Sequence, residues 1–274
     1  MTRLLFIGDI MGKPGRELVR RGLAAIVARH QIDLVIANGE NAAAGFGITP
    51  DLAEELFAYG VHVLTGGNHT WDKKEIVPYL GEQSRLLRPA NFPAGTPGRG
   101  RVVVRATNGV SVGVVNVMGR VFMTAIDDPF RVAVDEIDAI RGDARVILVD
   151  FHAEATSEKV AMGWHLDGRV AAVVGTHTHV PTADARVLPQ GTAYVTDVGM
   201  TGPHDSVIGV DRHAILRRFL TGLPQRFEVA TENPRLNAVA IAADEATGRA
   251  VSIERLSLSQ QDVEDLASQA APAR

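Results

Sequence analysis

The stretch Val170–His179, VAAVVGTHTH, is the most informative part of this 274-residue chain for both fold and site. Its first half is an apolar run typical of a buried β-strand, and it leads directly into Gly-Thr-His-Thr-His. Because alternate residues of an extended segment point the same way, His177 and His179 can direct their ring nitrogens at one small volume. This arrangement can hold a transition metal, although a histidine pair that only packs or hydrogen-bonds in a loop is the alternative.

Four other apolar runs also end in ligand-type residues. Ligands of α/β sheets bind beyond the carboxyl ends of the strands, so all five junctions are expected to converge on one polar site. Singly, Asp9 could cap a helix, Glu40 could be a surface charge, and Asn68 could favour a turn; five such junctions together favour a site. The four runs and the residues that follow them are Arg3–Ile7 with Gly8-Asp9, Leu34–Ala37 with Asn38-Gly39-Glu40-Asn41, Val61–Leu64 with Gly66-Gly67-Asn68-His69, and Val146–Val149 with Asp150-Phe151-His152.

Composition fits one enzyme-sized domain, expected over residues 1–256. The chain is 46% hydrophobic and can bury a large core, while its net charge of −4 gives no general attraction for nucleic acid. There is no cysteine, which excludes thiolate metal sites and leaves nitrogen and oxygen ligands. No apolar stretch approaches the roughly 18 residues of a membrane span, and no signal-type segment follows Met1, so a cytoplasmic protein is expected.

Apolar strand-like runs alternate with amphipathic segments, which predicts an α/β fold: a sandwich of two sheets with helices outside and the metal site at one edge. Parallel strands are expected in the first half, then a hairpin, and antiparallel strands near the C-terminus. The expected helices are one beginning near Pro14, then Pro50–Tyr59, Trp71–Leu80 and Ser157–Trp164. The other expected strands are Val102–Arg105, Val110–Val117, Ala193–Asp197, Arg226–Ala230, Asn237–Ala243 and Ala250–Leu256; Arg120–Arg131 is expected as a loop, and 257–274 as a polar tail or short helix.

Carboxylate, amide and imidazole ligands together suit Mn²⁺, Fe or Zn²⁺, and a carboxylate such as Glu40 can bridge two ions about 3.5–4 Å apart. Two such ions lower the pKa of a shared water and stabilise charge as a hydroxide attacks phosphorus, which predicts phosphoester hydrolysis without a protein nucleophile. His69, beside Asn68, is placed to protonate the leaving oxygen as general acid. A purely structural role for His69 is the alternative.

Several contiguous runs resemble one known family: FIGDIMGKPGR, IANGENAAAGFGIT, TGGNHTWDKKEI, RLLRPANFP, NVMGRVFM, VDFHAEATSEK, VGTHTHVPTAD, YVTDVGMTGPHDSVIG and FLTGLPQRFEVA. Over roughly Leu4–Glu254 the chain is similar to the YmdB-like branch of the calcineurin-like metallophosphoesterases. The resemblance implies a four-layer αββα sandwich of two mixed β-sheets flanked by helices, a dinuclear centre of iron or manganese, and phosphodiesterase activity toward 2′,3′-cyclic or 3′,5′-cyclic nucleotides.

The resemblance also implies the ligand sets. One metal would be bound by Asp9, Glu40, Asn41 and His179, and the other by Glu40, Asn68, His152 and His177, with His69 as the leaving-group acid. The wider superfamily usually opens with D-x-H and bridges its metals with an aspartate in G-D-x-x-D, whereas this chain has Asp9-Ile10-Met11 and Gly39-Glu40-Asn41. Because an amide stands in for an imidazole at the first site, that site is expected to exchange its metal more easily.

Three functions are compatible with the sequence. The favoured one is a dinuclear phosphodiesterase for small cyclic nucleotides, because a diester needs the protonation of its leaving group that His69 offers. The alternatives are a metal-dependent phosphomonoesterase or protein phosphatase, and a nucleotide-binding regulatory protein with a non-catalytic metal site. The expected partner is a small phosphodiester, without membrane or general nucleic-acid binding, and a symmetric homo-oligomer is compatible with the sequence.

Overall fold

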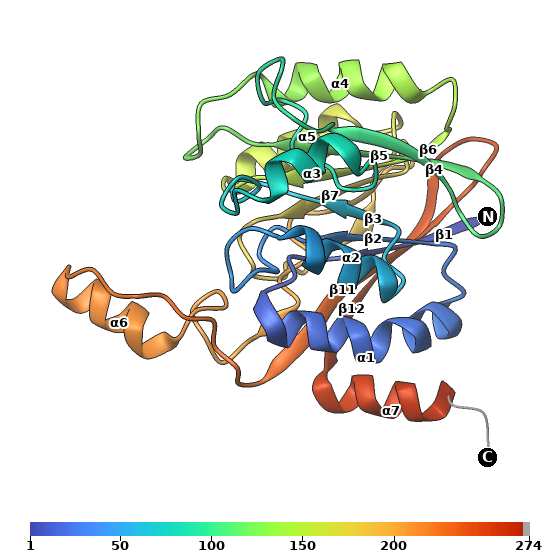
Figure 1. Cartoon of the computed structure of the whole chain (residues 1–274). Coiled ribbons are helices and arrows are strands. Elements are labelled where there is room, and N and C mark those ends of the chain that lie inside the picture. The colour runs from blue at the N-terminus through green and yellow to red at the C-terminus, as the bar shows by residue number, and fades with distance from the viewer. Residues whose placement is uncertain (271–274) are drawn as a thin grey trace.

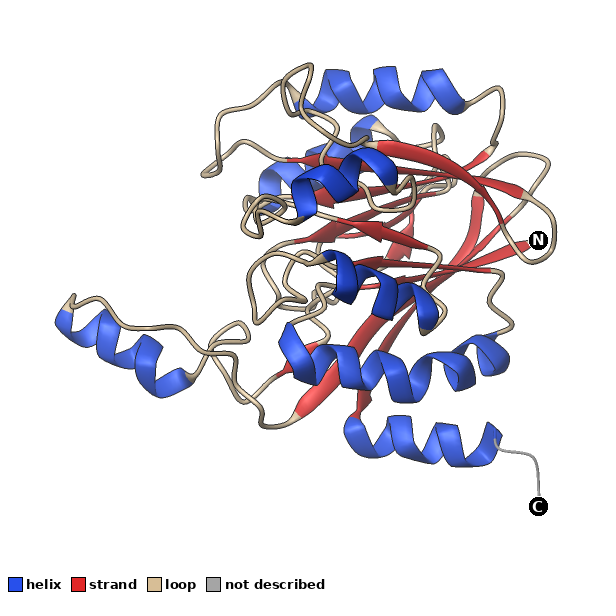
Figure 2. Ribbon diagram, in the orientation of Figure 1, coloured by secondary structure: helices blue, strands red, loops and turns tan. Residues whose placement is uncertain are grey.

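The computed structural model describes residues 1–270, which form two six-stranded β-sheets with helices on their outer faces (Figures 1 and 2). The strands are β1 (Thr2–Ile7), β2 (Leu34–Asn38), β3 (Val63–Thr65), β4 (Arg101–Arg105), β5 (Ser111–Met118), β6 (Val146–His152), β7 (Ala172–Thr176), β8 (Arg186–Val187), β9 (Ala193–Val195), β10 (Gly202–Pro203), β11 (Pro234–Ala243) and β12 (Ala250–Ser259). The helices are α1 (Gly12–His30), α2 (Pro50–Ala58), α3 (Ile76–Glu82), α4 (Pro129–Ile140), α5 (Thr156–His165), α6 (Arg212–Thr221) and α7 (Gln260–Ala270).

Both sheets are mixed. The first has the order β10-β11-β1-β2-β3 with β12 paired to β11, and the second has the order β4-β5-β6-β7-β9-β8. Strands β1, β2 and β3 run parallel, as do β5, β6, β7 and β9, whereas the remaining pairings are antiparallel. The parallel strands carry all five expected junctions, three in the first sheet and two in the second.

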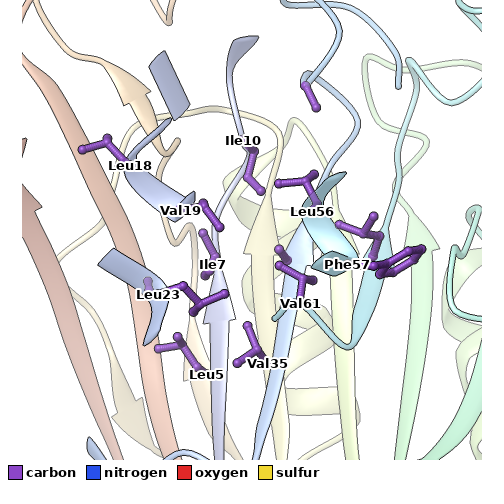
Figure 3. Close-up of a cluster of buried hydrophobic side chains, with 14 of the residues drawn as sticks. Leu5, Ile7, Ile10, Leu18, Val19, Leu23, Val35, Leu56, Phe57 and Val61 are labelled. Atoms are coloured by element: carbon purple, nitrogen blue, oxygen red, sulfur yellow. The ribbon is translucent and has the colours of Figure 1, made fainter. Parts of the chain in front are cut away.

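The side chains of β1 show how the layers form. Leu5 and Ile7 pack against α1 in the cluster drawn in Figure 3, whereas Leu4 and Phe6 lie in the cluster between the two sheets. Successive side chains of a strand point to opposite faces, so a strand covered on both sides reads as a continuous apolar run. A third cluster covers the outer face of the second sheet with residues of α4 and α5. The expected αββα sandwich is therefore confirmed.

Two helices of the described residues were not expected from the sequence. α4 begins at Pro129 inside the segment expected as a loop, because Asp128 caps it by accepting hydrogen bonds from the backbone of Phe130 and Arg131. α6 stands away from the body of the molecule in Figure 1 and buries only Ile215. A helix with so little buried surface leaves a weak pattern in the sequence.

Two expected elements were wrong in extent or type. Trp71–Glu75 forms turns before α3, since Asp72 and Ile76 donate backbone hydrogen bonds to the residues three positions earlier. Arg226–Ala230 is not a strand: Val229 makes one isolated bridge to Val210 at the base of the α6 segment.

The C-terminal segment expected as a tail or short helix first continues β12 to Ser259 and then forms α7. Val263 of α7 is fully buried beside Gly22 of α1, where an added Cβ would lie 2.7 Å from a Val263 methyl carbon. Residues 271–274 of that segment lie outside the described residues. Within the described part of the chain, no helix combines the length and apolarity needed to span a bilayer.

Candidate metal centre

The five strand ends meet at one edge of the sandwich. Strands of the first sheet lead into Asp9, Glu40 and Asn68, while β6 ends at His152 and β7 leads into His177. The backbone N–H of His177 lies 3.3 Å from Oδ1 of Asp9, and Nε2 of His152 lies 3.0 Å from Oε1 of Glu40. These contacts cross from one sheet to the other, so the edge of the sandwich is a single site.

Four side-chain atoms with lone pairs converge around His152. Its Nε2 lies 2.9 Å from Oδ1 of Asn68, 3.1 Å from Nδ1 of His177 and 3.0 Å from Oε1 of Glu40. Glu40, His152 and His177 form a group whose ligand atoms all lie within 4.8 Å of one another. Atoms that all offer lone pairs repel each other unless a cation or a proton lies among them, and nitrogen and oxygen donors suit Mn, Fe or Zn.

The hydrogen bonds of His152 fix which nitrogen is free. Thr176 donates its hydroxyl to Oδ1 of Asp150 (2.7 Å), so it accepts from Nδ1 of His152 at 2.9 Å. In neutral His152 the proton therefore sits on Nδ1, and Nε2 is left bare toward Glu40 and Asn68. This relay orients the ring as a ligand.

His177 and His179 are oriented in the same way. Nε2 of His177 lies 3.0 Å from a carboxylate oxygen of Glu154, and Nδ1 of His179 donates to the carbonyl of Ile208 at 2.8 Å. The other nitrogen of each ring is free to bind a metal. Both residues have a positive φ, 97° and 67°, which for residues other than glycine costs on the order of 1–3 kcal/mol each. The surrounding contacts must therefore hold this turn.

The Glu40 carboxylate is held at one oxygen and free at the other. The backbone N–H of Glu40 donates to Oδ1 of Asn38, which turns the chain after β2, and Oε2 accepts from the backbone of His69 at 3.0 Å. Oε1 is buried and accepts no hydrogen bond from the described residues. Gly67 permits this packing, because a Cβ there would lie 2.3 Å from Glu40 and His152.

The charges of Glu40 and His152 determine the protonation of the site. Burial opposes ionisation of Glu40, but the neighbouring His152 outweighs it and lowers the pKa of Glu40 to about 2. Burial also opposes the charge of His152, but the ionised Glu40 outweighs it and raises the pKa of His152 to about 9, so without a metal this ring is charged at neutral pH. Burial and the charge of His152 lower the pKa of His177 to about 3, so the His177 ring is neutral at physiological pH. A neutral imidazole beside an ionised carboxylate is the state in which both can bind a metal.

A second group of potential ligands lies beside the first. Nε2 of His179 is 3.9 Å from Oδ1 of Asp9, and Asp9 is fully buried. Asn41 donates its Nδ2 to the carbonyl of Gly45 at 2.9 Å, which turns its Oδ1 the other way, and this oxygen is buried without a partner among the described residues. A buried acceptor without a partner, one residue after Glu40, is a candidate ligand for a cation.

His69 lies at the rim of the site. Its Nδ1 lies 2.8 Å from Oδ2 of Asp72, and its ring packs edge-on against Phe46 at 5.0 Å between centroids. The carboxylate fixes the ring orientation through Nδ1, which leaves Nε2 as the atom that faces a substrate.

The structure thus brings Glu40, Asn68, His152 and His177 together, with Asp9 and His179 beside them and His69 at the rim. Asn41 follows Glu40 in the chain, and its buried Oδ1 has no partner among the described residues. The sequence interpretation missed the orienting residues, namely Asp72, Asp150, Glu154 and Thr176. Glu154 and Asp72 lie two and three residues after His152 and His69, and this proximity to predicted ligands was the available signal.

A family model described as YmdB-like protein matches residues 5–256. A 2′,3′-cyclic-nucleotide 2′-phosphodiesterase of Bacillus subtilis is 51% identical over 254 residues, which are 93% of this chain and 96% of the relative. Two solved structures are similar: a protein of Thermus thermophilus (46% identity, TM-score 0.87, 94% of this chain and 99% of the other) and a phosphatase from Mycoplasma pneumoniae (36%, 0.88, 94% and 93%).

Proposed function

The chain belongs to the YmdB-like family and is a phosphoesterase, and we propose that it is a metal-dependent phosphodiesterase acting on small cyclic nucleotides. The observation that carries the proposal is the convergence of ligand-type atoms of Glu40, Asn68, His152 and His177, which come from both sheets. The relative that is 51% identical and named for 2′,3′-cyclic nucleotides supports this substrate class, and 3′,5′-cyclic nucleotides belong to the same class of diesters.

Two metal ions would occupy the site, held by the residues whose free atoms face it. One set is Glu40, Asn68, His152 and His177, the other is Asp9, Glu40, Asn41 and His179, and Glu40 would be shared. When bound, such a pair supplies a nucleophile at neutral pH and stabilises charge on the phosphoryl oxygens. An all nitrogen and oxygen set fits iron or manganese, and also zinc.

The protein residues then perform two tasks. Glu154, Thr176 and the Ile208 carbonyl keep the three imidazoles in the orientation in which their free nitrogens point at the site. His69, with Asp72 at its Nδ1, donates a proton from Nε2 to the alkoxide that leaves when the ester bond breaks. A diester needs this proton because an unprotonated ribose oxygen is a poor leaving group.

The test is hydrolysis of 2′,3′-cyclic AMP by the purified protein, with metal content counted on the same sample. Turnover should track about two metals per chain and be lost in His177→Ala. His213→Ala is the matched control, because His213 is an exposed histidine on α6 outside the site. Bound metal without hydrolysis of this substrate, but with hydrolysis of p-nitrophenyl phosphate, would move the function to a phosphomonoesterase, and a protein without metal would overturn the proposal.

A further inference from the structure

A buried ion pair that belongs to neither ligand set lies next to the turn His177–His179. Lys159 on α5 and Asp197 after β9 are 1% and 0% exposed, and Nζ of Lys159 lies 2.6 Å from Oδ2 of Asp197. The same oxygen accepts from the hydroxyl of Thr178 at 2.7 Å and from its backbone N–H at 3.2 Å. Oδ1 accepts from the backbone of Gly199 at 2.8 Å. Asp197 therefore joins two loops at the metal edge.

Thr178 is the residue between His177 and His179, both of which adopt positive φ angles. Residues with a Cβ keep such angles only when the surroundings impose them. Asp197 binds Thr178 through backbone and side chain together, so it fixes the centre of this turn. The loop after Asp197 supports the same turn, because the backbone of Met200 donates to the carbonyl of His179 at 3.0 Å.

We propose that Lys159 and Asp197 are positioning residues of the metal centre, which hold the His177–His179 turn so that both imidazoles point into the site. The inference rests on the proposed function, since it assumes that the site binds metal. Lys159 balances the charge of Asp197 at Oδ2, the oxygen that also accepts from Thr178. A buried ion pair is by itself weak evidence of a contribution to stability, so a role in geometry accounts better for the hydrogen bonds to Thr178.

The test is calorimetric titration of the metal-free protein with Mn²⁺, together with thermal melting of each variant. Asp197→Asn and Lys159→Met should weaken Mn²⁺ binding by roughly 10- to 100-fold, the range found when residues that orient metal ligands are changed. Thr178→Val removes only the hydroxyl and should weaken binding in the same direction, while Thr178→Ser keeps the hydroxyl and should bind Mn²⁺ as the wild type does. If Asp197→Asn does not fold, the Thr178 pair decides the question.

Asp167→Asn is the matched control. Asp167 is also a buried carboxylate that accepts backbone hydrogen bonds, from Gln190 at 3.0 Å and Thr192 at 3.3 Å, but it precedes β7 whereas the metal-binding turn follows it. This variant should melt at a lower temperature and bind Mn²⁺ as the wild type does. If Asp197→Asn and Thr178→Val behave like this control, the pair is only structural and the inference is overturned. Wild-type protein that binds no Mn²⁺ would instead overturn the proposed function.

Discussion

At His69 one ring nitrogen is already occupied by the carboxylate of Asp72, which leaves one atom for the reaction. His69→Ala should lower kcat for 2′,3′-cyclic AMP by about 10²–10⁴-fold, the usual contribution of a general acid, while metal content is unchanged. Asp72→Asn should lower it less, because the ring is still present but poorly oriented.

A second substrate provides the control for this prediction. Bis(p-nitrophenyl) phosphate releases a weakly basic phenolate that needs no proton, so His69→Ala should lose much less activity with it. Equal losses with both substrates would contradict the role of His69 as an acid and favour a structural one.

The two ligand sets differ in their donors, and this predicts different affinities. The set around Asp9 offers one imidazole and spans 3.9 Å between Asp9 and His179. The other set offers two imidazoles, and Nε2 of His152 lies 2.9–3.1 Å from the ligand atoms of Asn68, Glu40 and His177. We expect the Asp9 set to release its metal first during dialysis against a chelator. Metal counts that fall from two to one before reaching zero would agree; a single step to zero, or two equally tight sites in titration, would refute it.

At the scale of residues, the sequence indicated candidate ligands but not the residues that orient them. Strand ends could be recognised from apolar runs, and His152, His177 and Glu40 have the side chains of ligands. Lys159 has no such signal, because its role comes from a contact with Asp197, 38 residues away in the chain. Asp150 stands at a strand end, but its contact with Thr176, 26 residues away, is not visible in the sequence. A lysine on an amphipathic helix is ordinarily read as solvent-exposed, and only the folded chain reveals its burial.

Among the elements, those with two buried faces or a clear apolar period were predictable. The core strands β1 and β6 read as continuous apolar runs because both faces are covered. α6 could not be predicted in the same way. Its apolar residues Phe219 and Leu220 are 79% and 84% exposed, so the apolar positions of this helix do not mark a buried face. Arg226–Ala230 has the composition of a strand, but among the described residues it pairs only through the isolated bridge between Val229 and Val210.

Helix α4 begins at a cap that can be tested directly. Asp128 accepts from the backbone of Phe130 and Arg131, and these bonds, the one from Arg131 first, lower its pKa below 3.8. Asp128→Ala should lower the free energy of unfolding by about 1 kcal/mol at neutral pH, measured by urea denaturation. Because the pKa of Asp128 is lower in the folded chain than its usual 3.8, the carboxylate stabilises the folded chain fully above pH 3.8. This stability is lost as the pH falls through the lower, folded pKa. The adjacent Asp127→Ala, outside the helix, should have little effect.

The pairing of β2 with the segment before β3 contains a titratable group. The backbone N–H of Val35 donates to Nδ1 of His62 at 3.1 Å, so this nitrogen must be unprotonated in the folded chain. Burial, with a smaller effect of Arg85, lowers the pKa of His62 below 6.5. Stability from this contact is therefore fully present above pH 6.5 and is lost as the pH falls through the lower folded pKa.

His62→Asn keeps an acceptor for Val35 but does not titrate. Urea denaturation between pH 7 and pH 5 should show a smaller loss of stability for this variant than for the wild type. His213→Asn, on exposed α6, is the control and should follow the wild type. Parallel pH profiles for all three proteins would show that His62 is not responsible.

Across the whole molecule, polar contacts join the two sheets at the edge that carries the candidate metal centre. Asp150 of β6 accepts hydrogen bonds from Thr65 of β3 and Asn38 of β2, at 2.5 and 3.3 Å, and from Thr176 of its own sheet. The candidate ligands are divided in the same way, with Asp9, Glu40 and Asn68 from one sheet and His152 and His177 from the other. A bound metal would therefore hold the sheets together as well as serve the reaction.

This arrangement predicts that metal stabilises the entire chain. A ligand at about 100 times its Kd that binds only the folded state stabilises by about 2.7 kcal/mol. For a chain of this size that corresponds to a rise in Tm of roughly 5–10 °C, because each kcal/mol shifts Tm by about 2–4 °C. Differential scanning calorimetry of metal-free protein with and without Mn²⁺ measures it, and His177→Ala should show a smaller rise because it lacks a ligand that joins the sheets. A metal that binds in titration but leaves the Tm unchanged would contradict this prediction, because it would then bind the unfolded chain as well as the folded one.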